Sequence, residues 1–289
     1  MAELSPVTGR YVTIDVLGDQ CKVFFLENGD PNSQPLVCQH TAGCHNHQWR
    51  YLLEDEEVTS DYRVIAYDLT NHGKSDPPAN KAWWKEEYRL TAEWYTAFIT
   101  SFCDALELRD PIFMGCSFGG NEALQLALHH PDRFGGIISV EGADYSPGFF
   151  LDWWQHPHAN AAQVSASGVW DLMAPQSPDS DRAATWFYYT QGSEAFRGDL
   201  YFYSRDHDLR GRLGEIDTSN CPLVMLTGEY DYLTTPEDSK RTAEGIAGAT
   251  FIEMEKIGHF PMSENYPVFK TYMQQALQKI NEEHKAAVG

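Results

Sequence analysis

Three side chains that could together activate a hydroxyl group lie far apart in a chain of 289 residues. Ser117 is the third residue of the motif GCSFGG, and Asp231 and His259 lie in two later turns. A serine hydroxyl is a weak nucleophile at neutral pH, so it needs an imidazole to accept its proton and a carboxylate to orient that imidazole. The chain order serine, acid, histidine matches one known class of catalytic triad. These residue types therefore predict nucleophilic catalysis at Ser117.

The residues around Ser117 predict a strand, a tight turn and a helix. The apolar residues 112–114 precede the turn, and the amphipathic segment 122–130 follows it. A serine at the tip of such a turn has a strained backbone, and glycines flank it because larger side chains would meet the strand and the helix. Asp231 and His259 each follow another predicted strand. Because the carboxyl ends of parallel strands share one edge of a sheet, we expect the three side chains to meet there.

The rest of the chain alternates short apolar runs with helical patterns, which predicts an α/β fold with a mostly parallel sheet. Residues 11–16 and 21–26 predict an opening antiparallel hairpin. Apolar residues at helical spacing predict core-facing helices near 94–106 and 269–280. Further strands are expected at 35–40, 62–69, 111–116, 136–140, 223–227 and 250–254.

Residues 144–213 interrupt this alternation, because they contain aromatic clusters but no convincing strand. We expect a helical insertion here, lying over the sheet. The chain then divides into a core, made of 1–143 and 214–289, and the insertion. The tryptophans of the insertion could line a substrate pocket or only fix the insertion to the core. The predicted substrate contacts are Thr41, Trp153, Trp154 and Trp186.

The chain resembles the α/β-hydrolase superfamily over about residues 12–280. Besides the motif around Ser117, the resemblance rests on HTAG at 40–43, DLTNHGKSD at 68–76 and GHFP at 258–261. It implies an eight-stranded sheet flanked by helices, with a cap inserted after the sixth strand, where the 144–213 segment falls. It also implies that Ser117 is the nucleophile, His259 the general base and acid, and Asp231 the orienting carboxylate.

The resemblance further implies an oxyanion hole made of two backbone N–H groups. One belongs to Phe118 and the other to a residue of the turn at 40–43, for which we choose Ala42, with Thr41 as the alternative. Thr41 stands where glycine is common in the family, and its hydroxyl could supply an extra hydrogen bond. For the acid, Glu229 and Glu141 are rivals of Asp231, since some similar hydrolases carry the carboxylate after the sixth strand.

Cys44, His45 and His47 look like metal ligands, but the sequence offers no matching second cluster, so we expect no metal. The sequence contains no dinucleotide glycine pattern or phosphate loop, and acyl transfer needs no cofactor, so none is expected. The six cysteines have no paired spacing, which predicts reduced thiols.

The formal net charge of −21 disfavours binding to nucleic acid or to anionic membrane surfaces. No apolar stretch approaches the roughly 18 residues that a membrane span needs. We therefore expect a cytoplasmic protein whose partner is a small-molecule substrate, and the question of a homodimer stays open.

The activity expected from these residues is hydrolysis of a small apolar or aromatic carboxylic ester or lactone through an acyl-enzyme. The alternative is a carbon–carbon bond hydrolase of ring-cleavage products, which the chain resembles in length, triad and cap. A cofactor-free dioxygenase is a weaker match: CHNH at 44–47 resembles that branch, but Cys116 and Phe118 stand where it has histidine. The non-enzymatic alternative is a ligand receptor on the same fold.

Overall fold

Eight strands form one sheet in the computed structural model, which describes residues 4–155, 158, 160–192 and 194–288. The spatial order of the strands is β1-β2-β4-β3-β5-β6-β7-β8. β2 runs antiparallel to β1 and β4, and the other neighbours are parallel, which confirms the predicted mostly parallel sheet. The strands are β1 (Thr8–Val16), β2 (Asp19–Asn28), β3 (Gln34–Gln39), β4 (Tyr62–Tyr67), β5 (Ile112–Cys116), β6 (Gly136–Val140), β7 (Leu223–Gly228) and β8 (Thr250–Met254).

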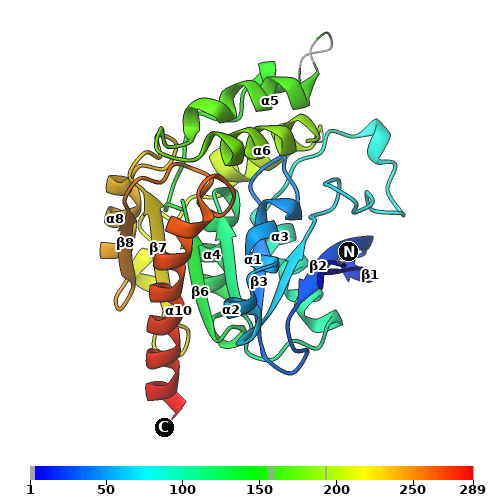
Figure 1. Cartoon of the computed structure of the whole chain (residues 1–289). Coiled ribbons are helices and arrows are strands. Elements are labelled where there is room, and N and C mark those ends of the chain that lie inside the picture. The colour runs from blue at the N-terminus through cyan, green and yellow to red at the C-terminus, as the bar shows by residue number, and fades with distance from the viewer. Residues whose placement is uncertain (1–3, 156–157, 159, 193, 289) are drawn as a thin grey trace.

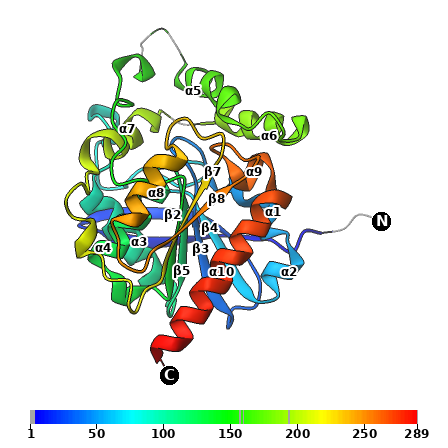
Figure 2. The ribbon, with the colours of Figure 1, turned by 90° about the vertical axis from the view of Figure 1, so that its left-hand side faces the viewer.

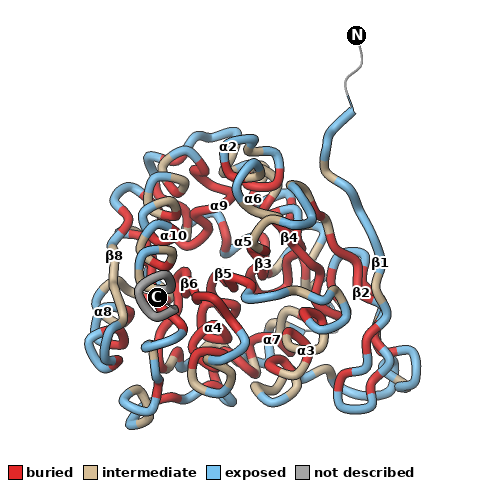
Figure 3. The backbone as a smooth tube through the Cα atoms, turned by 90° about the horizontal axis from the view of Figure 1, so that it is seen from below, coloured by how far each residue is buried: buried red, intermediate tan, exposed pale blue. Residues whose placement is uncertain are grey.

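The predicted opening hairpin is confirmed, with Val12 of β1 opposite Val23 of β2. β1 is an edge strand and is largely exposed (Figure 3). Two predicted strands end earlier than expected, β3 at Gln39 and β4 at Tyr67. The reason in β4 is that the Asp68 carboxylate accepts backbone N–H groups of neighbouring loops, so the chain turns away from the sheet there.

Helices cover both faces of the sheet (Figure 1). α3, α4 and α8 pack on one face, and α1, α2 and α10 on the other. The helices are α1 (Arg50–Leu53), α2 (Glu56–Thr59), α3 (Ala92–Ala105), α4 (Phe118–His129), α5 (Ala161–Val169), α6 (Asp179–Thr190), α7 (Phe196–Tyr201), α8 (Pro236–Glu244), α9 (Pro261–Glu264) and α10 (Tyr266–Val288).

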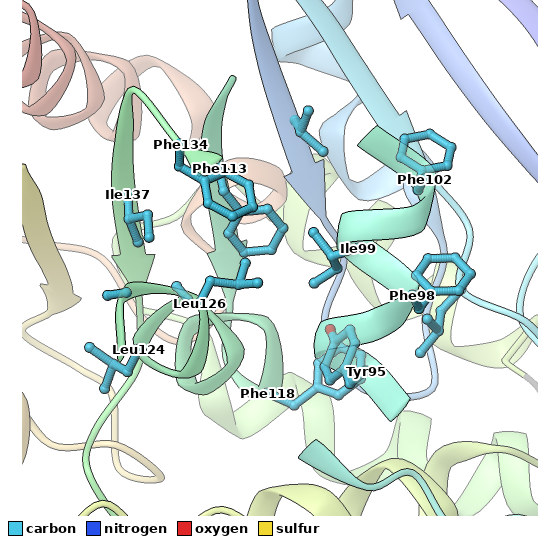
Figure 4. Packing of buried hydrophobic residues seen from close by; sticks show 14 of the residues in the cluster. Tyr95, Phe98, Ile99, Phe102, Phe113, Phe118, Leu124, Leu126, Phe134 and Ile137 are labelled. Carbon is cyan, nitrogen blue, oxygen red and sulfur yellow. The ribbon is translucent and has the colours of Figure 1, made fainter. Parts of the chain in front are cut away.

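The core has two halves because strand residues alternate between the two faces. In β5, Phe113 joins the cluster under α3 and α4, whereas Ile112 and Met114 join the cluster under α10. Figure 4 shows the first cluster, in which Ile99 of α3 points toward Phe113 of β5. Phe98 and Phe102 of the same helix pack on Tyr67 of β4. Helices therefore cover both faces of the sheet, which is consistent with the complete burial of β5, β6 and β7.

The described part of the 144–213 segment forms α5, α6, α7 and short helical turns between β6 and β7. Its one pairing of the β type is an isolated bridge between Tyr145 and Asp208. α5 and α6 form a separate layer beyond one end of the sheet (Figure 2). Among the described helices, none is long and apolar enough to cross a membrane.

Candidate active site

Ser117 lies in a strained turn between β5 and α4. Its φ is 61° and its ψ is −118°, a left-handed conformation that costs energy for a residue with a Cβ atom. The turn is tight enough that a Cβ atom on Gly115 would collide with the carbonyl group of Gly119, and one on Gly120 would collide with the carbonyl oxygen of Val140. The glycines of the motif are thus needed for the close approach of β5, α4 and β6.

The structure brings Ser117, Asp231 and His259 together from three loops at the carboxyl ends of β5, β7 and β8. His259 Nε2 lies 2.9 Å from Ser117 Oγ, and His259 Nδ1 lies 2.7 Å from Asp231 Oδ2. The other carboxylate oxygen of Asp231 accepts hydrogen bonds from the N–H groups of Leu233 and Thr234. All these donors favour the ionised carboxylate, so Nδ1–H of His259 donates to Asp231 and Nε2 can accept the serine proton.

Of the two rival acids, only Glu141 lies at the site. The side chain of Glu229 accepts the N–H of Lys256, in an exposed turn. Glu141 is fully buried at the end of β6, where both carboxyl oxygens lie 3.0 Å from the N–H of Gly228. Among the described residues, Glu141, Asp231 and His259 form a group with polar atoms within 4.8 Å of one another. Burial, and then the charge of Asp231, raise the pKa of Glu141 well above its usual value.

The turn after β3 leaves one backbone donor free beside two that are occupied. The N–H of Thr41 donates to Gln48 Oε1 at 2.9 Å, and the N–H of Gly43 donates to Asp199 Oδ2 at 2.7 Å. The N–H of Ala42, between them, has no hydrogen-bond partner among the described residues. Phe118 is the first residue of α4, where N–H groups have no acceptor within the helix. Ala42 and Phe118 therefore remain the candidate oxyanion donors, and Thr41 is the weaker choice.

The four predicted substrate contacts differ in how far they are buried and in the groups they touch. The hydroxyl of Thr41 is buried and lies 2.5 Å from the hydroxyl of Tyr189 in α6. Trp154 donates its indole N–H to the carbonyl of Phe149, and its ring packs against Phe196. Trp153 stacks on Trp154 but is 51% exposed, and Trp186 is 41% exposed on α6. A substrate contact by these three tryptophans stays a prediction.

Two aromatic rings that the sequence did not single out lie at the triad. The ring of Phe260 packs against His259 with 5.0 Å between centroids, and Tyr189 packs on Phe260. Phe260 follows the histidine directly in the GHFP motif, so its position was available from the sequence. Tyr189 was one of four consecutive aromatic residues in the insertion, and nothing in that run distinguished it from its neighbours.

The Cys44, His45 and His47 side chains pack in the loop after β3. Both histidine rings contact Tyr188 of α6, and Cys44 is buried in the same apolar cluster. Burial lowers the pKa of His45 to about 4, so this ring is neutral at physiological pH. Among the described residues, these three side chains do not form a group of three ligand atoms within reach of one ion.

A hollow of about 610 Å³ lies between the loop that follows β4 and the start of α7. Trp83, Trp84, Tyr88 and Gly198 are among the residues that line it. Its lining does not include Ser117, Asp231 or His259, so this hollow is separate from the triad.

A family model described as alpha/beta hydrolase fold matches residues 34–266. The chain is 23% identical to a 2-hydroxy-6-oxononadienedioate/2-hydroxy-6-oxononatrienedioate hydrolase of Cupriavidus pinatubonensis, with 91% of this chain and 92% of that protein covered. It is also 23% identical to 3-oxoadipate enol-lactonase 2 of Acinetobacter baylyi, with 88% and 92% covered.

Among solved structures, an enol-lactonase from Burkholderia xenovorans superposes with a TM-score of 0.78 at 19% identity, covering 93% of this chain and 100% of that one. An esterase from Thermogutta terrifontis gives the same TM-score at 18% identity, covering 94% and 99%. At such identities these two structures show that the fold is shared.

Proposed function

The chain belongs to the α/β-hydrolase fold family and is a hydrolase, and we propose that it cleaves a small apolar or aromatic carboxylic ester or lactone. The observation that carries this proposal is the unbroken chain of hydrogen bonds from Asp231 through His259 to Ser117, at 2.7 and 2.9 Å. Such a chain is what a serine hydroxyl needs in order to react at neutral pH.

In the proposed mechanism, Ser117 Oγ attacks the carbonyl carbon while its proton passes to His259 Nε2. Asp231 keeps the imidazole in the required tautomer and stabilises the imidazolium that forms. The N–H groups of Ala42 and Phe118 would receive the developing oxyanion. His259 then protonates the leaving alcohol, and water, deprotonated by the same ring, hydrolyses the acyl-enzyme.

The rings beside the triad support an apolar substrate. Phe260 lies against His259, Tyr189 packs on Phe260, and α6 brings Tyr189 from the 144–213 segment. We therefore also propose that this segment acts as a cap over the site. The backbone N–H of His259 donates to the carbonyl of Leu172 in the same segment, which ties the cap to the catalytic loop.

The second candidate is hydrolysis of a carbon–carbon bond in a ring-cleavage product. It is supported by the similarity, over 91% of this chain, to a 2-hydroxy-6-oxononadienedioate/2-hydroxy-6-oxononatrienedioate hydrolase. Esters and ring-cleavage products are different compounds, so an assay panel that contains both classes distinguishes the two candidate activities.

The proposal is tested by labelling the purified protein with a fluorophosphonate probe, with Ser117→Ala as the control. We expect one adduct, located at Ser117 by mass spectrometry, and hydrolysis of p-nitrophenyl esters or lactones. Ser117→Ala should lower kcat by roughly 10⁶-fold, the size expected for loss of a triad serine, while the circular dichroism spectrum stays unchanged.

Two results would count against the proposal. If a folded protein takes no label, Ser117 is not an activated nucleophile, and a binding role becomes the better explanation. If the label is found at Ser117 but only ring-cleavage products are consumed, the triad stands and the second candidate replaces the first.

A further inference from the structure

The turn that carries Ala42 is held by a carboxylate from the 144–213 segment. Asp199, in α7, is fully buried, and its Oδ2 accepts the N–H of Gly43 at 2.7 Å. Phe196 of the same helix lies so close to Gly43 that a Cβ atom there would collide with its ring. Gly43 also has a φ of +65°, which favours glycine. α7 thus contacts this turn through both an aromatic ring and a hydrogen bond.

His72 binds the same oxygen of Asp199 that accepts the N–H of Gly43. Its Nδ1 lies 2.9 Å from the carbonyl oxygen of Thr70, and its Nε2 lies 2.7 Å from Asp199 Oδ2. Both neighbours are acceptors, so both ring nitrogens must carry a hydrogen, and His72 is an imidazolium. The hydroxyl of Tyr88 donates to the other oxygen of Asp199 at 3.1 Å. The buried carboxylate therefore has a charged partner and two neutral donors.

His40, whose ring centroid lies 5.0 Å from that of His72, shows the contrasting state. Its Nδ1 faces the carbonyl of Thr41, but its Nε2 accepts the N–H of Leu69, so the ring is neutral. Of these two histidines, only His72 is an imidazolium, and its charge is paired with the Asp199 carboxylate. A paired buried charge of this kind is strongly destabilised when one partner is removed.

We propose that Asp199 is a positioning residue for the oxyanion hole. The occupied N–H groups of Thr41 and Gly43 lie on either side of Ala42, with Gln48 holding the first and Asp199 the second. Fixing both neighbouring peptides restricts the orientation of the N–H of Ala42, which in the proposed mechanism receives the oxyanion formed at Ser117. Asp199 acts through the turn and touches no reacting atom. This inference rests on the proposed function, since it assumes an oxyanion at that point.

The test compares Asp199→Asn with Asp206→Asn. Asp206 lies seven residues later, and its carboxylate also accepts a backbone N–H, that of Ala92 at the start of α3, away from the turn. Active sites are counted with the fluorophosphonate probe, so that kcat refers to intact sites. We expect Asp199→Asn to lower kcat by ~10- to 100-fold, because displaced oxyanion donors lose transition-state stabilisation. Its KM should stay within about threefold, because a ground-state carbonyl uses these donors weakly.

A second measurement does not depend on turnover. Hydrogen exchange of a peptide covering 40–48 should be faster in Asp199→Asn than in the wild type and in Asp206→Asn, because a neutral amide oxygen holds the N–H of Gly43 less strongly than a carboxylate does. If Asp199→Asn does not fold, His72→Gln replaces it: this variant keeps the carboxylate but removes its cation, and we expect it to lower kcat severalfold and to speed the same exchange.

The inference is overturned if Asp199→Asn, or His72→Gln in its place, matches Asp206→Asn in kcat within twofold and in the exchange of 40–48. A fall in thermal stability with unchanged kcat per titrated site would overturn it as well, since Asp199 would then be merely structural. Failure of the proposed function looks different, because the wild type itself would then neither take the probe nor hydrolyse esters.

Discussion

Two carboxyl groups lie beside His259, and the hydrogen bonds they receive distinguish them. Asp231 accepts from two backbone N–H groups as well as from the imidazole, whereas Glu141 accepts from the N–H of Gly228. Donors stabilise a carboxylate, and burial destabilises one. Two neighbouring buried carboxyl groups do not both ionise readily, so Asp231 carries the charge and Glu141 the proton.

This assignment predicts opposite outcomes for two isosteric variants. Asp231→Asn should lower kcat by roughly 10⁴-fold, because the amide cannot hold the imidazole in its working tautomer. Glu141→Gln should keep kcat within about threefold, because a neutral amide closely resembles a neutral carboxylic acid in shape. Initial rates on one ester, normalised to titrated sites, measure both. Near-silent Asp231→Asn together with a crippled Glu141→Gln would show that Glu141 is the acid.

The residues found from the sequence and those missed differ in kind. Ser117, Asp231 and His259 each lie in a turn with a recognisable pattern that follows a strand, so their meeting point could be predicted. Asp199 holds the N–H of Gly43 from a helix that is distant in the sequence, and Gln48 holds the N–H of Thr41 from seven residues further along the same loop, but the neighbourhoods of these two residues show no pattern. The contact of Asp199 depends on how the 144–213 segment lies on the core, which periodicity does not determine.

At the scale of elements, the turn between β5 and α4 depends on close backbone approach. Gly115→Ala should lower the free energy of unfolding by ~1–3 kcal/mol or more, because the new methyl group would meet the backbone of Gly119. Gly168→Ala is the matched control: Gly168 lies within α5 with open space around its Cα, so alanine should raise stability by ~0.5–1 kcal/mol. Urea unfolding of both variants gives the comparison, and equal effects would contradict this account of the turn.

The helices and strands that could be predicted are those whose residues follow a simple pattern. The buried strands read as short apolar runs, and the stripes of α3 and α10 repeat at helical spacing. The structure confirms the strands from β3 to β8 and α3 within two residues, whereas α10 extends beyond the predicted 269–280 at both ends. The 144–213 segment could be identified as helical, but the bounds of α5, α6 and α7 could not. Its aromatic residues occur in consecutive runs, as at 186–189, and a run of that kind marks no single face of a helix.

For the whole molecule, buried ionisable groups and an excess of acid determine how stability depends on pH. The chain has 42 acidic and 21 basic side chains. Burial lowers the pKa of His45 and His207 to about 4, so stability rises with pH while the unfolded histidines lose their protons, up to about pH 6.5. Burial raises the pKa of Glu264 to about 8 and that of Glu122 and Glu141 well above the usual value, which acts in the opposite direction.

The effect of the carboxyl groups dominates above about pH 6.5, the pKa of an unfolded histidine, because the unfolded histidines then hold at most half of their protons. Between that pH and the value of about 8 for Glu264, the folded state holds protons that the unfolded state has released, so the free energy of unfolding must fall as pH rises. His72 adds to the fall, because its pKa is raised by the Asp199 charge and its contribution is lost as the ring deprotonates. Repulsion within the net charge of −21 acts in the same direction but is screened by salt.

We therefore expect urea unfolding at pH 6.5, 7.25 and 8 to give a steadily falling free energy, with a slope that Glu264→Gln reduces by up to ~1.4 kcal/mol per pH unit. The amide resembles the neutral acid beside the N–H groups of Gly258 and Ala174 but has no proton to lose. Repeating the series in ~1 M salt, where the Debye length is about 3 Å, should flatten the part due to net charge and leave the difference between wild type and variant. Parallel slopes at both salt concentrations would show that Glu264 is ionised in the folded protein.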